Sequence, residues 1–242
     1  MSGMAQVWND QKGSYIVEAS IDSTGPKSIT SLLTADKHTY STIKNYERSI
    51  IRTAAARNQP KAIADFPGIA PDASGPSLKW LNTITARYQL VERLIQELLA
   101  VSSGVDPASP AFPANTRKFK ECGLLLLYRL RDLEKSRGGK SAFIDQLPSS
   151  SLAAMIHVLF EARGARSVII YQLGKMPEVL VDIIDDRATQ RQLHGAFALK
   201  HGCPWNQVLA TIEEAVDMGL RELKPCDFNR LVAGMPVELF ES

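Results

Sequence analysis

The feature that most constrains the fold is an apolar repeat in steps of three and four residues. In the segment 78–101, LKWLNTITARYQLVERLIQELLAV, the recurring apolar side chains are Leu81, Ile84, Tyr88, Val91, Ile95 and Leu98. This spacing places them on one face of an α-helix. Ser77 stands directly before the segment, where its hydroxyl can cap the first turn. The segment therefore predicts a long amphipathic helix.

Similar patterns, separated by Pro and Gly, continue along most of the chain. Helices are expected over residues 36–59, 78–101, 116–140, 151–164, 177–202, 204–223 and 226–234, and a short helix or turn is expected over 165–175. Residues 59–76, with four prolines and two glycines, predict a connector, and residues 102–115 predict a second loop. The fold class expected is all-α, a helical bundle of about eight helices.

The N-terminal residues 1–35 have a different composition. The stretch GSYIVEASIDSTGPKS is rich in β-branched residues and is broken at Gly25–Pro26. This favours an irregular, partly extended N-terminal arm over a helix. Residues 36–242 would then form the α-helical domain. Because residues 102–115 are Pro-rich and carry few charges, that domain could divide into lobes 36–102 and 115–242.

The composition is that of a soluble globular protein. The chain has 242 residues, of which 45% are hydrophobic and 22% charged, so it can bury a sizeable core. The three cysteines are widely separated, which indicates no disulfide framework and favours a reducing compartment. We see no signal peptide and no apolar run long enough to cross a membrane. The expected location is the cytoplasm, or the virion if the protein is viral.

Positive charge is concentrated in one stretch. The net charge is only +2, but residues 116–140 hold eight Lys/Arg and three Asp/Glu, whereas residues 141–242 hold nine and thirteen. A second basic series follows one face of the helix expected over 36–59, near Tyr40 and Tyr46, whose rings could stack on bases. The side chains expected to contact phosphate are Lys37, Lys44, Arg48, Arg52, Arg117, Lys118, Lys120, Arg129, Arg131, Lys135, Arg137 and Lys140.

The basic stretch also allows two alternative interpretations. Its Gly-Gly-Lys-Ser ending at 138–141 looks like part of a phosphate-binding loop, but Glu134 stands where that loop needs glycine, and a helix precedes it instead of a strand. A glycine cap at the end of a helix accounts for the same residues. The charges themselves could also be a solvated face that pairs with the acidic C-terminal third of the chain.

The residues favour neither metal binding nor catalysis. His194, His201 and Cys203 are spaced too widely along one helix to chelate a metal without a bend. The acidic run at 182–186 occurs once, and Arg187 and Arg191 follow it at a spacing that allows ion pairs. No nucleophile motif is present, and Cys122 falls on an apolar stripe. We therefore expect no metal, no cofactor and no enzymatic activity.

One stretch resembles a known family loosely. LYRLRDL (127–133) and LPSSSLAAMIHVLFEARGA (147–165) are similar to the basic helix and the following helix of orthomyxovirus matrix proteins. The similarity covers about a fifth of the chain, includes no invariant motif and does not assign the chain to that family.

A local positive surplus, an extended arm and the lack of a catalytic constellation together favour one function. We expect a self-assembling structural protein that binds nucleic-acid backbone non-specifically, such as a viral nucleocapsid, coat or matrix protein. Its partners would be single-stranded RNA and further copies of itself, joined through the N-terminal arm. A helical adaptor without nucleic-acid binding is one alternative, because IDQLPSSSLAAMIHVLFEARG (144–164) has the start and spacing of an adaptor helix. An α-helical enzyme whose pocket is not visible in the sequence is the other.

Overall fold

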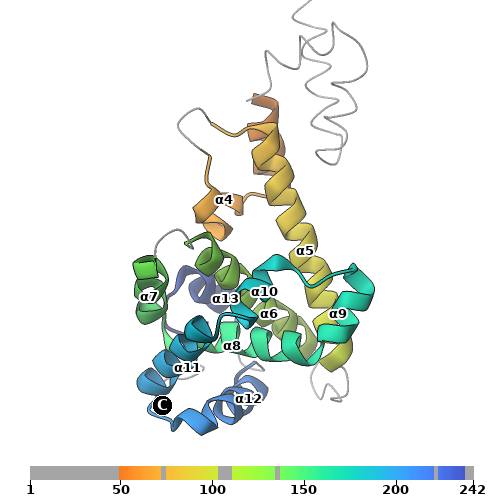
Figure 1. Ribbon diagram of the computed structural model, residues 1–242. Coiled ribbons are helices and arrows are strands. Elements are labelled where there is room, and N and C mark those ends of the chain that lie inside the picture. The colour runs from red at the N-terminus through yellow and green to blue at the C-terminus, as the bar shows by residue number, and fades with distance from the viewer. Residues whose placement is uncertain (1–48, 72–74, 103–110, 134–136, 221–222, 238–242) are drawn as a thin grey trace, which may run out of the picture. The chain divides into compact units, whose positions relative to one another are not determined.

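The computed structural model describes residues 49–71, 75–102, 111–133, 137–220 and 223–237 (Figure 1). All regular secondary structure in these ranges is helical, so the all-α prediction is confirmed. The expected N-terminal arm lies outside the described residues. The chain divides into two compact units, Met1–Tyr88 and Gln89–Ser242, and the boundary lies inside helix α5 (Leu78–Ser102).

In the first unit, the described part of the helix expected over 36–59 is helical from residue 49 to residue 58. Its face carrying Ile50, Ile51 and Ala54 packs with Leu81 of α5 in one buried cluster. The backbone N–H of Trp80 donates a hydrogen bond of 3.2 Å to Ser77 Oγ, which confirms the expected cap of α5.

The expected connector contains two short helices, α4 (Ala62–Asp65) and the 3₁₀ helix η1 (Pro67–Ile69). Side chains of α5 hold both. Trp80 Nε1 donates to the carbonyl oxygen of Ile69 at 2.8 Å, and the Tyr88 hydroxyl donates to Asp65 Oδ2 at 2.6 Å. The part of the connector that carries α4 and η1 is therefore packed against α5 within the first unit.

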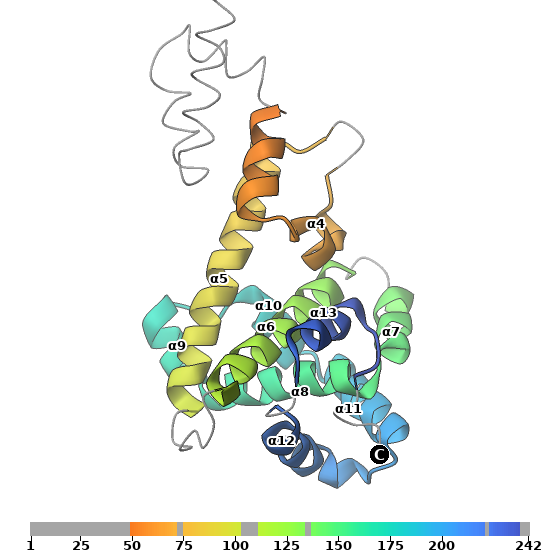
Figure 2. The same ribbon diagram turned by 180° about the vertical axis from the view of Figure 1, so that it is seen from behind.

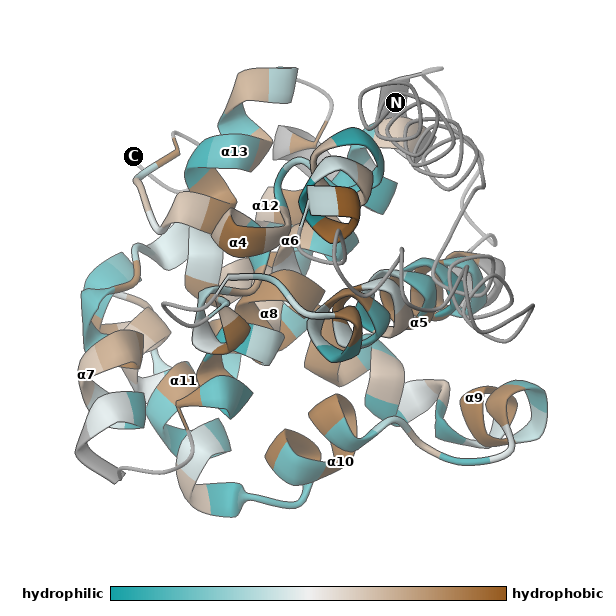
Figure 3. Cartoon of the chain, turned by 90° about the horizontal axis from the view of Figure 1, so that it is seen from above, coloured by the Kyte–Doolittle hydropathy of each residue, from teal (hydrophilic) through white to brown (hydrophobic). Residues whose placement is uncertain are grey.

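The second unit is built around α8, which runs across it with α6 and α13 on one side and α11 and α12 on the other (Figures 1 and 2). The elements are α6 (Ala111–Asp132), α7 (Arg137–Gln146), α8 (Ser149–Gly164), α9 (Arg166–Leu173), α10 (Glu178–Ile184), α11 (Arg187–His201), η2 (Trp205–Gln207), α12 (Val208–Gly219) and α13 (Pro225–Ala233). Apolar residues dominate α8 and α10, whereas hydrophilic residues dominate α11 (Figure 3). A helix that is apolar on all sides needs neighbours on all sides.

The closest contact in this unit joins α6 to α8. Leu124–Tyr128 of α6 are all buried, so this part of the helix is covered on several sides. Gly123 makes the approach possible, because a Cβ atom at this position would lie 2.4 Å from the carbonyl oxygen of Ala154 and 2.8 Å from Val158 Cγ2. The two backbones therefore approach at a point where only glycine fits.

Several predicted helix boundaries were wrong. The helix expected over 116–140 begins earlier, at Ala111, because Pro113 falls in the first turn, where its missing N–H leaves no hydrogen bond unmade. It ends at Asp132. Gly138 and Gly139 lie in the first turn of the next helix, α7, so they do not cap the C-terminus of a helix. The helix expected over 177–202 is split in two.

The split lies in the acidic run. Asp185 ends α10, and Asp186 begins α11 as its N-cap residue. The Asp186 carboxylate accepts hydrogen bonds from the backbone N–H groups of Ala188 at 3.1 Å and Thr189 at 3.2 Å. The Thr189 hydroxyl, at 2.6 Å, contributes most to lowering the pKa of Asp186, followed by these backbone bonds. Cap formation at Asp186 outweighs the continuous apolar pattern and breaks the helix.

Candidate nucleic-acid interface

The first basic residues of α6 are paired with carboxylates. Arg117 donates hydrogen bonds to both carboxylate oxygens of Glu92 in the part of α5 that belongs to the second unit. These bonds are the main reason that the pKa of Glu92 is lowered. Lys118 Nζ lies 2.5 Å from Glu121 Oε2, one turn further along α6. Both cations remain partly exposed, but each faces an acid.

The prediction for Lys120 was wrong. It was expected to contact phosphate, but its side chain is completely buried, with 0% exposed. Its Nζ atom donates to Glu161 Oε1 of α8 at 2.8 Å and to the carbonyl oxygen of Leu98 at 3.2 Å. His157 Nε2 lies 3.5 Å from the same Glu161 oxygen. This ammonium group joins α5, α6 and α8 in the interior and cannot reach a nucleic acid.

The cations in the second half of α6 also bind acceptors on neighbouring helices. Arg129 donates to the carbonyl oxygen of Val232 near the end of α13. Arg131 donates to Glu178 at 2.7 Å and to Asp182 at 3.0 Å, both on α10. Burial acts to lower the pKa of Arg131, but the two carboxylates outweigh it and raise the pKa. These arginines hold α10 and α13 against α6.

The remaining predicted residues are distributed over both units. Lys140 Nζ lies 3.9 Å from Asp186 Oδ2, and Arg52 is exposed on the helical stretch 49–58 of the first unit. The others lie outside the described residues or have side chains outside them: Lys37, Lys44, Arg48, Lys135 and Arg137. Where the structure describes the basic stretch in the second unit, it therefore finds structural ion pairs and hydrogen bonds.

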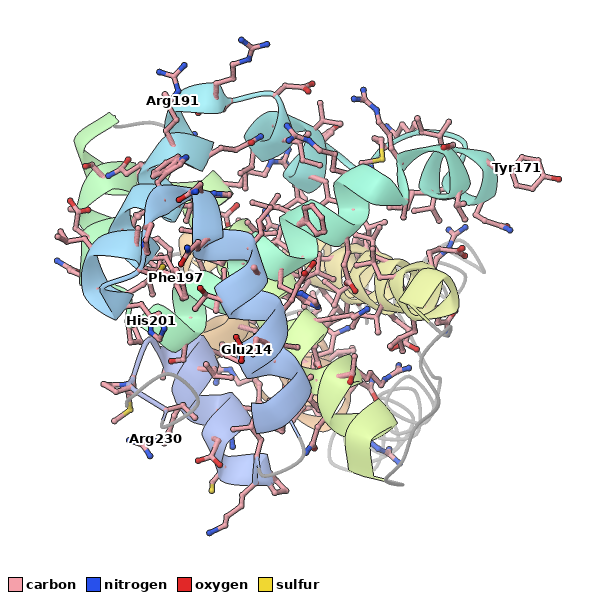
Figure 4. All side chains as sticks on the ribbon, turned by 90° about the horizontal axis from the view of Figure 1, so that it is seen from below. Tyr171, Arg191, Phe197, His201, Glu214 and Arg230 are labelled. Atoms are coloured by element: carbon pink, nitrogen blue, oxygen red, sulfur yellow. The ribbon has the colours of Figure 1, made fainter. Side chains whose placement is uncertain are left out.

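A different set of cations faces solvent in the second unit. Arg163 on α8 and Arg187 and Arg191 on α11 are exposed, and none of them forms an ion pair within the described part of the chain. Arg191 projects away from α11 in Figure 4. Residues 187 and 191 are one turn apart, so their side chains neighbour each other. We call these three residues the arginine surface.

Gln190 connects the two helices of the arginine surface. Its Nε2 atom donates to the carbonyl oxygens of Ile183, at 3.2 Å, and Ile184, which are left without helical partners at the end of α10. Arg163 Nη2 then donates to Gln190 Oε1 at 3.4 Å. The glutamine thus keeps the guanidinium of Arg163 beside α11.

A shallow pocket of about 60 Å³ opens between α8, α10, α11 and α12 beside these arginines. Its lining is apolar apart from three side chains, Arg163, Gln190 and His194. An apolar cavity that holds a benzene ring measures about 150 Å³. The pocket therefore has room for a few methyl or methylene groups and not for an enclosed ring.

His194 links the pocket to an exposed tryptophan. The ring centroids of His194 and Trp205 are 5.6 Å apart, with 39° between the ring planes. Burial lowers the pKa of His194, and the nearby charge of Arg163 lowers it further. The imidazole is therefore uncharged at neutral pH, so it adds an aromatic face and no charge to this surface.

The arginine surface was missed because its sequence pattern also fitted ion pairing within one helix. Arg187 and Arg191 follow three aspartates, and pairs with those acids were the expectation. In the structure Asp182 pairs with Arg131 of α6 and Asp186 caps α11, so these carboxylates are engaged elsewhere. The one available signal was the alignment of 187, 191 and 194 at steps of four and three, which places two arginines and a histidine on one face.

Three further features of the described ranges concern metal ligands, cysteine burial and the apolar character of the helices. No three His, Cys, Asp or Glu side chains gather there as they would around a metal ion. Cys122 is buried, with its Sγ atom 3.5 Å from the carbonyl oxygen of Phe228. None of the helices that the structure describes combines the length and apolar character of a membrane span. In comparisons with known proteins, no protein-family model, no curated protein and no solved structure matches the chain.

Proposed function

We propose that this chain is a structural protein that binds the backbone of single-stranded RNA without reading its sequence and assembles with copies of itself, as viral nucleocapsid, coat and matrix proteins do. The observation that carries the proposal is the arginine surface: three exposed guanidinium groups on adjacent helices, with no carboxylate bound to them among the described residues. The proposal therefore assigns the interface to α8 and α11 of the second unit, and not to the basic helix α6.

Arginine is well suited to this role. Its planar guanidinium offers several N–H donors to phosphate oxygens and keeps its charge at every physiological pH. Contacts of this kind are independent of base identity. A buried or already paired arginine must first lose a partner, whereas Arg163, Arg187 and Arg191 can bind phosphate without breaking an ion pair to any described residue.

Acidic residues restrict where the strand can lie. Asp185 is exposed just before α11, and Glu213 and Glu214 are exposed on α12. In Figure 4 the Arg191 side chain points away from α12, where Glu214 lies. Because phosphates are repelled by carboxylates, the proposed path follows α8 and α11 and avoids α12.

Assembly belongs to the same proposal. An arm of about 35 residues can span about 100 Å when extended, enough to reach a neighbouring copy. The arm comprises residues 1–35, and its sequence carries Tyr15, Ile16 and Val17, apolar groups that a neighbour could bury. A protein that coats RNA in the cytoplasm or in a virion would act in this way.

The test compares two variants with equal loss of charge. Arg163→Ala/Arg187→Ala/Arg191→Ala removes the arginine surface, and Arg93→Ala/Lys175→Ala/Arg230→Ala removes three other exposed cations of the second unit. We expect the first variant to bind a fluorescent 20-nucleotide RNA at least about tenfold more weakly than the second, measured by anisotropy at low salt. Equal loss in both variants would exclude a specific interface, and no binding by the unmodified chain would refute RNA binding altogether.

One observation favours the adaptor alternative. The short helix α9 exposes Val168, Ile170 and Tyr171, the last with 85% of its surface accessible and directed away from the helix in Figure 4. Exposed apolar groups of this kind are typical of protein contacts. Light scattering after size exclusion separates the two cases: assembly with absorbance at 260 nm supports a coat protein, and a monomer that retains one protein partner supports an adaptor.

A further inference from the structure

We propose that Trp205 and Phe160 form a platform on which unpaired bases stack while the arginine surface contacts the phosphates. The inference rests on the proposed function and adds to it the part of the ligand that is recognised: the exposed faces of bases in a single strand. Aromatic side chains beside cations are the usual means by which proteins bind single strands without sequence preference.

Trp205 is held in position and remains accessible. It lies in η2, and 51% of its surface is exposed. One side of the indole packs on α11, where its ring neighbours His194, and a Cβ atom at Gly195 would lie 3.3 Å from Trp205 Cζ3. Because α11 fixes the ring from one side, stacking a base on the accessible part requires little loss of side-chain freedom.

Phe160 is the second exposed ring. It lies on α8 one turn before Arg163, and 46% of its surface is exposed. An exposed aromatic ring next to an exposed arginine offers a base a face to stack on and its phosphate a cation to bind. At this spacing a base on Phe160 has its phosphate within reach of Arg163.

The two rings belong to one surface. Phe160 and His194 line the same pocket, and His194 contacts Trp205. The path Phe160–His194–Trp205 thus crosses from α8 over α11 to η2, and Arg163 lies beside it in the lining of the pocket. His194 is uncharged at neutral pH because its pKa is lowered, so the imidazole adds no charge to this path.

The small volume of the pocket decides how a base can bind. At about 60 Å³ the pocket cannot enclose a purine or pyrimidine, so bases lie on the exposed rings instead of entering a specific cavity. Stacking uses the face that all four bases share, and the bases of a duplex do not offer that face. Single strands of any sequence should therefore bind better than duplexes.

The experiment measures anisotropy of a labelled 20-nucleotide single-stranded RNA and of a duplex of the same length. Trp205→Ala/Phe160→Ala is compared with Tyr171→Ala, which removes an exposed aromatic ring elsewhere in the second unit. We expect the double variant to bind the single strand about ten- to hundredfold more weakly, with no change in duplex affinity or in salt dependence, because no charge is removed. Tyr171→Ala should bind both as the unmodified chain does.

Trp205→Phe is the control for a folding defect. It keeps an aromatic ring at this position, so it should retain most of the affinity for the single strand. Loss of affinity in Trp205→Phe equal to that in the double variant would overturn the platform, as would unchanged single-strand binding by the double variant. If the unmodified chain binds neither RNA, the proposed function itself fails, and the platform fails with it. If the unmodified chain binds RNA and the ring variants bind it equally well, the platform is refuted and the proposed function stands.

Discussion

At the scale of single residues, Lys120 places an ammonium group in the interior of the second unit. The Glu161 carboxylate and the Leu98 carbonyl oxygen accept its hydrogen bonds. Removing a charge from water is costly, and the pair is tolerable because each member satisfies the other. Once one partner is removed, the other remains largely buried without the opposite charge that it paired with.

We therefore expect Lys120→Ala to destabilise the chain by about 3–5 kcal/mol, since it leaves Glu161 largely buried without its cation. Lys118→Ala is the matched control, because Lys118 lies on the same helix but is exposed, and it should cost at most about 1 kcal/mol. Urea unfolding followed by circular dichroism measures both. Similar losses in the two variants would show that Lys120 is not a structural residue.

Single residues also show why some site predictions did not hold. Lys120 was expected to contact phosphate and therefore to face solvent, but α5 and α8 cover its side of α6. Whether a lysine at such a position is buried depends on which carboxylate the fold brings to it, and Glu161 is 41 residues away in sequence. A pairing of this kind is a tertiary property, which charge counts along the chain do not contain.

At the scale of helices, the packing of α6 on α8 depends on one glycine. Gly123 has the carbonyl oxygen of Ala154 and the side chain of Val158 directly opposite its Cα atom. A methyl group there would have to displace the backbone of α8, which carries ten buried residues. The contact therefore transmits any change at residue 123 to both central helices.

We expect Gly123→Ala to cost about 1–3 kcal/mol or more, because overpacking outweighs the gain in helix propensity. Gly164→Ala, at the end of α8, meets nothing within 4 Å and should be neutral or stabilise by up to about 1 kcal/mol. Thermal melts of the two variants check the difference. A stabilised Gly123→Ala variant would contradict the close approach of the two backbones.

The accuracy of the predicted helix limits depended on the signals at the helix ends. α5 and α8 have unbroken apolar patterns and strong end signals, Ser77 for α5 and Gly164 for α8, and their predicted limits agree with the structure to within two residues. The division between α10 and α11 was missed, because Asp186 could be either a helical residue or a cap. Asp186 is a cap because its carboxylate accepts hydrogen bonds from the backbone N–H groups of Ala188 and Thr189, and the apolar pattern does not predict these bonds.

At the scale of the whole molecule, the cations that build the fold differ from the cations that are available to a ligand. The basic stretch at 116–140 was expected to be the interface, and its described side chains instead hold α5, α8, α10 and α13 to α6. The exposed arginines come from the part of the chain with a net negative charge. Overall charge balance therefore did not indicate where a positive surface lies.

The salt dependence of RNA binding tests the central claim most directly. Each phosphate contact in a single strand changes the slope of log affinity against log salt by about −0.7. If Arg163, Arg187 and Arg191 each contact a phosphate, replacing all three with alanine should make the slope shallower by about 2. The control variant at Arg93, Lys175 and Arg230 should keep the slope of the unmodified chain. An identical slope in the arginine-surface variant and the unmodified chain would show that the strand does not lie on α8 and α11.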